Sequence, residues 1–525
     1  MKGKLWERNR FLLKPILGMF VIYLVGISAI ILAGVHYADD VARTNYGYAG
    51  WSAFSRYSST FLSHGIHADN YLTNIAPLPQ ILAALILAVA SVILVCLVSG
   101  KEVFEAVFSK WILKLVAVVP LALCPYMLEC LSYQYDAVYM ALSVFFAVMP
   151  FVFYQQARWK FVLASIVGIL GVCTTYQVSI GIYLMLVVFL AIKDWNGRKF
   201  KNKEIIKSLL ISAVVFLLTL LFFQKALMRT RDVYVSNELP GLTEFFPSLS
   251  THLLHYFELL FKDFRLLWLV LIGIMTLGFV VMFVKRSRQN KILACVVGIV
   301  GVAAMGVASY LLYAALDKPL YTTRAMYAIG AFVAIIGVYI VSSEVSRNRY
   351  KIISAKIKEK KNEFSLSMSL NVEEVVFTVA TMVLSWCFFS FSFTYGNALK
   401  EQDAFRNMQV DMVISDLNEI LDDGNVRKIQ AIGQIDFAPA IEHMPENEYY
   451  ILKRLLKPSF GTDVPWMAYR LTEASGLFGL VYDSNIDLVN KDLPVLKDTA
   501  LYIIYGDLDN ILVKFKGEEF DIWEN

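Results

Sequence analysis

The sequence predicts a mostly α-helical membrane protein with about eleven transmembrane helices and a small C-terminal α/β or α+β domain. Apolar residues make up 58% of the 525 residues and charged residues only 18%, with a mean hydropathy of +0.57. This composition leaves too little polar surface for a soluble fold of this length. Apolar runs long enough to cross a bilayer recur up to residue 395, and Lys and Arg gather in alternate loops between them.

The apolar runs define the predicted spans one by one. They lie at residues 12–35, 78–99, 112–128, 137–154, 161–176, 178–193, 208–225, 266–284, 292–313, 326–343 and 375–395. The fifth and sixth spans form a tight hairpin around Thr175, Tyr176 and Gln177. The first run is too long for the apolar part of a signal peptide and lacks a small-residue cleavage site, so we expect an uncleaved first span.

The distribution of Lys and Arg predicts the orientation. Basic residues gather in the segment 2–14 and in the loops 193–207, 285–291 and 344–372. Cytoplasmic loops carry such an excess, so the N-terminus is predicted in the cytoplasm and, with an odd number of spans, the C-terminus outside. We therefore expect a multi-pass protein of the bacterial inner membrane, with the basic loop 344–372 resting on anionic lipid of the bilayer.

Two domains follow from this topology. Residues 1–395 are predicted to form the transmembrane domain, with long outer loops at 36–77 and 226–265. Residues 396–525 are predicted to form an extracytoplasmic domain, whose 12 basic and 23 acidic residues make it acidic. Strand-like runs lie at 500–505 and 511–513.

Several function classes find no support in the sequence. The cores of the spans hold almost no ionisable residues, whereas ion-coupled transporters keep such groups near the midplane. Phosphate-binding loops, GxSxG and basic nucleic-acid motifs are absent from the sequence, and the six cysteines show no CxxC spacing. The histidine pairs His64/His67 and His252/His255 lack a third ligand, so no cofactor is expected and a divalent metal has no support.

Charged and aromatic residues gather where the spans reach the outer side. After the first span come Asp39, Asp40, Arg43, Trp51 and Arg56. A carboxylate there can take a proton from a hydroxyl, guanidinium groups can hold a phosphate, and the ring can stack on a sugar. The same residues also fit an interfacial aromatic belt with a carboxylate pair that caps a loop helix.

Two further clusters lie at the same face. Glu129 and Asp136 follow the third span, and Arg324 enters the tenth span, where it can hold the phosphate of a lipid. Glu129 and Asp136 equally fit ordinary polar residues of a turn between two helices, and Arg324 equally fits an interfacial arginine that extends toward water. Arg229 and Arg231 are weaker candidates of the same kind.

These clusters form motifs in a fixed order. The positions are Ala38, Asp39, Asp40, Arg43, Gly47, Tyr48, Gly50, Trp51 and Arg56, then Pro77 to Gln80, then Pro125 to Asp136, and then Tyr176, Gln177 and Arg324. Over residues 30–330 the chain resembles the serotype-converting O-antigen glucosyltransferases, type II, which are bacterial membrane enzymes of the GT-C class. It departs from that family at Ser55, where Gly is usual, and at Cys130, where Asn commonly follows the Glu.

The resemblance implies a hexosyltransferase that moves a sugar, typically glucose, from a polyprenyl-phosphate donor to a surface polysaccharide such as O-antigen. In an inverting mechanism a carboxylate deprotonates the acceptor hydroxyl, the hydroxyl attacks the anomeric carbon, and the lipid phosphate leaves. Asp39 or Asp40 is the expected base, and Asp40 is preferred because it lies further from the membrane. Glu129 and Asp136 are expected to bind acceptor hydroxyls or to support the loop. The expected substrate-binding residues are Arg43, Trp51, Arg56, Glu129, Tyr133, Asp136, Gln177 and Arg324.

Other functions remain open at this point. A flippase or transporter of lipid-linked sugars needs a polar path and symmetric halves, and the sequence shows neither. A membrane scaffold for envelope polysaccharide assembly would bind a partner through the tail. A GT-C enzyme could instead act on protein, lipid A or a wall polymer, and the sequence leaves the sugar and the linkage open.

Overall fold

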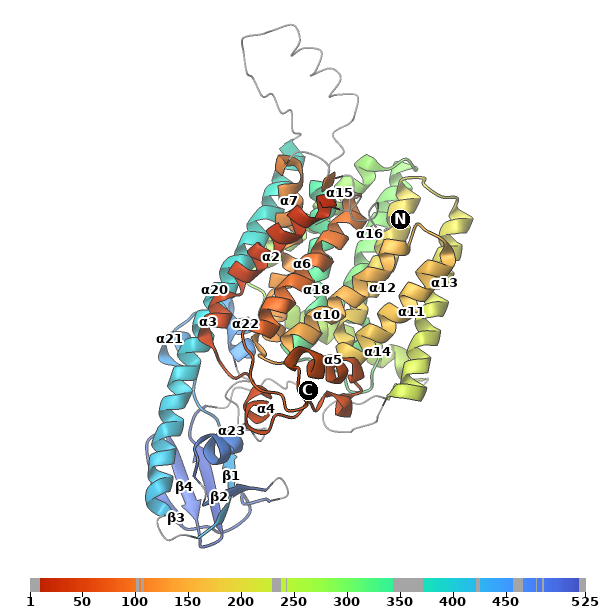
Figure 1. Cartoon of the computed structure of the whole chain (residues 1–525). Coiled ribbons are helices and arrows are strands. Elements are labelled where there is room, and N and C mark those ends of the chain that lie inside the picture. Colours follow the sequence, from red (N-terminus) through yellow and green to blue (C-terminus); the bar gives the residue numbers. More distant parts are fainter. Residues whose placement is uncertain are drawn as a thin grey trace.

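The computed structural model shows a bundle of apolar helices with a small mixed sheet at one end (Figure 1). The described residues are 10–100, 103–104, 108–228, 238–241, 243–342, 372–421, 425–456, 466–477, 479–483 and 486–518. Arg229, Arg231 and, apart from Val372, the basic loop 344–372 lie outside these ranges.

Seven helices in the described part of the chain are long and apolar enough to cross a membrane. They are α6 (Leu78–Ser99), α11 (Arg158–Thr175), the segment Gln177–Asn196 with α12 (Ile180–Asn196), the segment Asn202–Leu227 with α13 (Asn202–Phe222), α15 (Leu266–Arg286), α16 (Lys291–Ala308) and α20 (Val372–Ile420). These helices indicate a membrane protein. The break between α11 and α12 lies at the predicted hairpin.

The other four predicted spans coincide with shorter or broken apolar helices. Three of them contain α2 (Leu13–Gly26), α10 (Ala137–Val148) and α18 (Ala328–Val341). The fourth contains α7 (Phe108–Val118), α8 (Pro120–Leu123) and α9 (Pro125–Ser132), and it bends by 61° before α9. Each predicted span therefore falls on apolar helix, while the total of eleven crossings stays a prediction.

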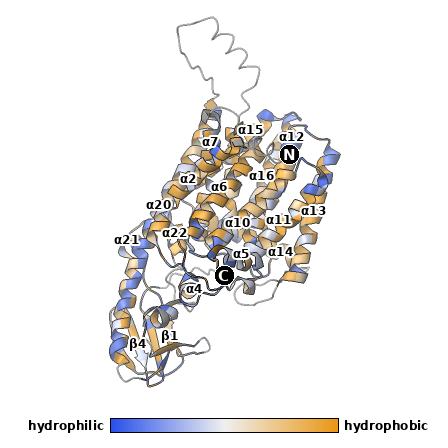
Figure 2. Cartoon of the chain, in the orientation of Figure 1, coloured by the Kyte–Doolittle hydropathy of each residue, from blue (hydrophilic) through white to orange (hydrophobic). Residues whose placement is uncertain are grey.

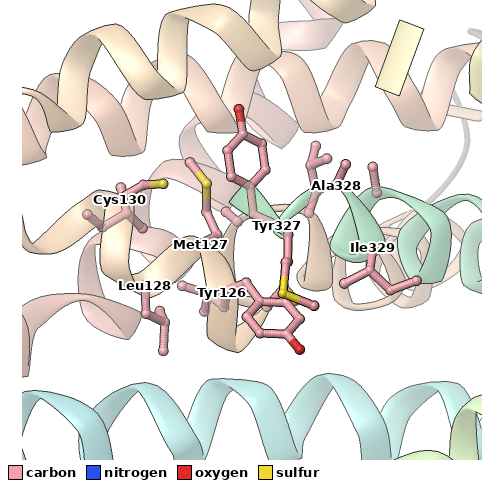
Figure 3. Packing of buried hydrophobic residues seen from close by; sticks show 14 of the residues in the cluster. Tyr126, Met127, Leu128, Cys130, Tyr327, Ala328 and Ile329 are labelled. Atoms are coloured by element: carbon pink, nitrogen blue, oxygen red, sulfur yellow. The ribbon is translucent and has the colours of Figure 1, made fainter. Parts of the chain in front are cut away.

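Helix α18 lies in the core of the bundle. All of its residues are buried, and it contacts α6, α7, α8, α15 and α20. Figure 3 shows Tyr327 and Ala328, at the start of α18, beside Tyr126 and Met127 of α9. Helix α9 is also buried along its whole length. The packing of α9 and α18 therefore fixes the positions of the turn after α9 and the turn before α18.

The outward faces of the peripheral helices are apolar. On α13, Leu210 is 61% exposed and Leu217 54%, and on α16 Ile299 is 55% exposed. Figure 2 shows hydrophobic residues along the bundle and hydrophilic residues at helix ends and in the C-terminal part. Because apolar surface costs about 25 cal/mol per Å² in water, such faces are suited to lipid.

The C-terminal part forms a five-stranded mixed sheet in the order β2-β1-β5-β4-β3. Strand β1 pairs parallel with β2 and β5, and β4 pairs antiparallel with β3 and β5. The strands are β1 (Arg427–Ile432), β2 (Leu480–Tyr482), β3 (Val495–Asp498), β4 (Tyr502–Gly506) and β5 (Asn510–Phe515). The two predicted strand-like runs are β4 and β5, which confirms a small C-terminal unit of helices and strands.

Helix α20 links the bundle to the sheet. It has 49 residues, which corresponds to a length of about 74 Å. A Cβ at Gly396 would lie 2.5 Å from the backbone of Ala29, so glycine lets α20 lie against α3 (Ser28–Ala33). At the other end, the Tyr502 hydroxyl donates to Asp416 on α20 at 2.7 Å. The domain boundary after residue 395 stays a prediction, since α20 runs through it.

Candidate active site

The segment between α3 and α6, which carries several candidate residues, lies at the bundle end nearest the sheet (Figure 1). The segment between α3 and α6 forms α4 (Asp40–Tyr46), the 3-10 helix η2 (Trp51–Phe54) and α5 (Tyr57–His67). Gly47 ends α4 with φ +60°, and its N–H donates to the Arg43 carbonyl at 2.8 Å. Only glycine adopts this left-handed conformation without strain, and the resulting turn places Trp51 back beside α4.

A buried network joins this loop to the turn before α10. Arg43 donates to Asp136 through Nη1, and its Nη2 lies 3.4 Å from Asp39 Oδ2. The Trp51 indole N–H also donates to Asp136, and the guanidinium lies 4.5 Å from the Trp51 ring centroid. Burial alone would lower the pKa of Arg43, but the carboxylates of Asp136, Asp39 and Asp40 raise it. Arg43 is therefore a neutralised structural cation.

Asp40 is enclosed within the same region. Its side chain is fully buried, and Oδ2 accepts the backbone N–H groups of Tyr37 at 3.1 Å and Gln134 at 2.9 Å. Burial raises the pKa of Asp40 well above its usual value, against the opposing effect of the Gln134 N–H. The Asp39 side chain, in contrast, is 34% exposed.

Arg56 and Arg324 lie around a buried tyrosine at the hairpin between α11 and α12. The Arg56 guanidinium lies 4.6 Å from the Tyr176 ring centroid, and the Tyr176 hydroxyl donates to the Arg324 carbonyl at 3.4 Å. In the part of the chain that the structure describes, no carboxylate oxygen lies within 4 Å of the Arg56 guanidinium. Gln177 follows in the same hairpin and donates to the Cys173 carbonyl at 3.0 Å.

Glu129 fixes the segment that carries Arg324. This carboxylate is buried and accepts the Arg324 backbone N–H at 2.6 Å and the Thr323 hydroxyl. The Arg324 side chain donates to the Tyr133 hydroxyl through Nη1. Tyr133 lies three residues before Asp136, which holds Arg43 and through it the partly exposed Asp39, so one segment joins Arg324 and this carboxylate.

These positions change several expectations from the sequence. Asp40 does not lie further out than Asp39, because its side chain turns inward to pair with Gln134. Trp51 is only 1% exposed and lies against Arg43 and Tyr139, so it offers no open ring to a sugar. Glu129 and Asp136 were expected either to bind acceptor hydroxyls or to support the loop. Both carboxylates accept hydrogen bonds from other protein groups, which is the arrangement of loop supports.

Sequence reasoning did not identify the contacts between this site and the C-terminal part. The Tyr37 hydroxyl donates to the Leu455 carbonyl of α22 (Glu446–Leu456) at 2.6 Å, and Arg470 donates to the His36 carbonyl at 3.1 Å. The two contacts join residues 418 and 434 positions apart. No pattern in the sequence predicts pairs at such separations.

Neither histidine pair belongs to a group of three metal-binding side chains in the described part of the chain. His67 Nδ1 lies 2.9 Å from the Ser63 carbonyl and His252 Nδ1 lies 3.0 Å from the Ala314 carbonyl. Among the described residues, no group of three His, Cys, Asp or Glu side chains is arranged to hold a metal ion. The requirement for a cofactor stays a matter for experiment.

Comparison with known proteins identifies the family. Residues 28–335 match the family described as Glucosyl transferase GtrII. An uncharacterized 55.3 kDa protein in the gtrB 5′ region of Salmonella phage P22 is 26% identical over 189 residues, 36% of each chain, so the match spans about a third of that relative. No solved structure matches the chain. Because the family match covers more than half of the chain and contains all the candidate residues, this chain belongs to the GtrII glucosyl transferase family.

Proposed function

We propose that the chain transfers glucose from a polyprenyl-phosphate carrier to a surface polysaccharide such as O-antigen, with inversion at the anomeric carbon. The reaction takes place at the outer face of the bacterial inner membrane. The observation that carries this proposal is that partly exposed Asp39 and Arg324 are both tied to the segment between α9 and α10, Asp39 through Arg43 and Asp136, and Arg324 through Tyr133. Family membership supports the sugar transfer, and the apolar helices support a donor with a lipid tail.

Asp39 is the general base in this proposal. Its carboxylate is partly open to solvent, and an acceptor hydroxyl can therefore reach it by a direct hydrogen bond or through one water. As the hydroxyl proton moves to Asp39, the acceptor oxygen forms a bond to the anomeric carbon. The bond from that carbon to the phosphate oxygen breaks, and polyprenyl phosphate leaves with the bonding electrons.

Arg56 and Arg324 stabilise the leaving phosphate. Positive groups that are fixed before the reaction lower the barrier where negative charge develops, and guanidinium groups match phosphate oxygens. Arg56 suits this role because no carboxylate within the described ranges pairs with it. Arg43 is reassigned to support, because Asp136 and Asp39 already neutralise it.

The remaining candidates position these groups. Asp136 and Trp51 fix Arg43 and hence the Asp39 loop, while Glu129 and Tyr133 fix Arg324. Gln177 follows Tyr176 in the hairpin, and we assign its amide to a hydroxyl of the donor sugar. The arginines supply the positive charge that the leaving group needs, so the proposed reaction uses no cofactor.

Turnover by the purified protein tests this function. The full chain in detergent is incubated with polyprenyl-phosphate glucose and delipidated O-polysaccharide of the host cell. We expect free polyprenyl phosphate and glucosylated polysaccharide in equal amounts, with the opposite anomeric configuration by NMR. Turnover with a different lipid-linked sugar would change the donor but keep the class. A folded protein that is silent with every donor, yet moves lipid-linked sugar across liposomes, would establish a flippase.

A further inference from the structure

Four tyrosines form a row that crosses from the Asp39 loop to the C-terminal sheet. Tyr46 and Tyr48, at the end of α4, are 44% and 39% exposed. The Tyr46 ring lies 5.9 Å from that of Tyr469 on α23 (Trp466–Tyr469), and Tyr469 lies 5.0 Å from Tyr482 on β2. Tyr469 and Tyr482 are both half-buried, so parts of these rings reach the surface.

The row begins at the proposed base. The Arg43 guanidinium lies 6.0 Å from the Tyr48 ring centroid, and its Nη2 lies 3.4 Å from Asp39 Oδ2. At the other end, β2 is an edge strand of the sheet. The rings therefore connect the reacting carboxylate to the rim of the C-terminal part.

Hydrogen bonds fix the part of the row on α4 relative to the part on α23 and β2. Arg470, the residue after Tyr469, donates to the carbonyl of His36 at 3.1 Å. Burial lowers the pKa of Arg470 to about 10, against the opposing effect of Asp40. Tyr37, next to His36, donates to Leu455. Because α23 also packs on α4, the tyrosines are positioned by the fold before any ligand binds.

Tyrosine rings combine an apolar face with a hydroxyl. A pyranose ring has the complementary pair, an apolar C–H face and a rim of hydroxyl groups. Aromatic side chains with a few polar groups are typical linings of ligand sites.

We infer that this tyrosine row is an extended binding site for a neutral polysaccharide, the acceptor, and that the C-terminal part thereby selects long acceptors. The inference rests on the proposed function, because the row ends at the carboxylate that would activate the acceptor hydroxyl. One sugar unit at Asp39 is bound by the bundle alone. Units further along the chain lie on Tyr469 and Tyr482.

The test compares fragments of one and of five repeat units of the host's delipidated O-polysaccharide. Binding to the full-length protein in detergent is measured by calorimetry without donor, and KM and kcat are measured with polyprenyl-phosphate glucose. Tyr469→Ala and Tyr482→Ala are the test variants. Tyr505→Ala is the control, because Tyr505 is also half-buried on the sheet but packs against Leu488 and Leu512 instead.

We expect each test variant to weaken binding of the long fragment by about tenfold, the effect of losing one stacked ring, and to raise its KM equally. The kcat and the KM for the single unit should not change, and Tyr482→Phe should restore long-fragment binding. Equal affinity of wild type and both Ala variants for the long fragment would overturn the inference. Wild type that binds and glucosylates both fragments equally well would overturn it too, yet would leave the proposed function standing. Absence of all turnover in wild type would instead remove the proposed function.

Discussion

Replacing Asp39 by asparagine should abolish transfer while leaving the fold intact. Asparagine keeps the size of the side chain but cannot accept the hydroxyl proton at neutral pH. General-base catalysis contributes about 10²- to 10⁴-fold, so kcat should fall by that factor. The structural cost is small, because Asp39 is partly exposed and lies 3.4 Å from Arg43, while Arg43 keeps its closer bond to Asp136.

The neighbouring carboxyl provides a matched control. Asp40→Asn keeps an oxygen for the N–H groups of Tyr37 and Gln134, and it resembles the protonated form that burial favours. Its activity and stability should therefore stay near those of wild type. Asp40→Ala leaves two buried N–H groups without an acceptor and should cost about 2 to 6 kcal/mol of stability.

The assay follows release of polyprenyl phosphate from polyprenyl-phosphate glucose, and thermal unfolding in the same detergent monitors folding. An Asp40→Asn protein that is folded but inactive, next to an active Asp39→Asn protein, would show that the buried carboxyl is the base. If both asparagine variants turned over like wild type, neither carboxyl would be the base and the reasoning would fail.

Three further predictions address the arginines and one histidine. Arg56→Ala should lower kcat/KM by about 10²-fold through loss of leaving-group stabilisation, with an unchanged melting temperature. Arg158 is exposed at the far end of the bundle, so Arg158→Ala should leave kcat/KM unchanged. Equal loss of kcat/KM in both variants would contradict the phosphate role. Arg454→Ala leaves the buried carboxylate of Asp263 without its cation and should cost about 3 to 5 kcal/mol, seen as a lower melting temperature; an unchanged value would exclude a tight pair. Burial and two nearby arginines lower the pKa of His36 below its usual 6.5. The unfolded chain therefore binds the proton more readily, and stability falls as pH drops below about 6.5. Melting curves from pH 7.5 to 5 should show a smaller decline in melting temperature for His36→Gln than for wild type, and an equal decline would refute this.

The sequence was sufficient for the helical framework because lipid imposes a simple rule. A segment that crosses the bilayer must be apolar over its length and must satisfy its backbone internally, so each predicted span falls on apolar helix. The candidate site residues lie in the short helices and turns between the long spans, while their roles stay a prediction. Asp39, Arg43 and Trp51 follow the first predicted span closely, and Glu129 and Asp136 follow the third.

The direction of individual side chains was beyond the sequence. Asp39 and Asp40 are neighbours, and only the Gln134 backbone, 94 positions away, decides which one turns inward. Trp51 has the composition of a sugar platform, but its indole N–H finds Asp136, 85 positions away. Such choices depend on which distant donors and acceptors arrive at the same place, and local pattern carries no information about them.

The proposed reaction joins two substrates of opposite character, and the positions of the charged groups suit both. A donor with a polyprenyl tail would approach from lipid, so its phosphate contacts have to lie close to the bundle, where Arg324 precedes α18 and Arg56 lies against Tyr176 between α11 and α12. A polysaccharide would approach from water, so the proposed base has to be open to solvent, as the partly exposed Asp39 is. Arg43 is held by both Asp39 and Asp136. Its charge therefore fixes the position of the proposed base, which a loop without such a cation would leave variable.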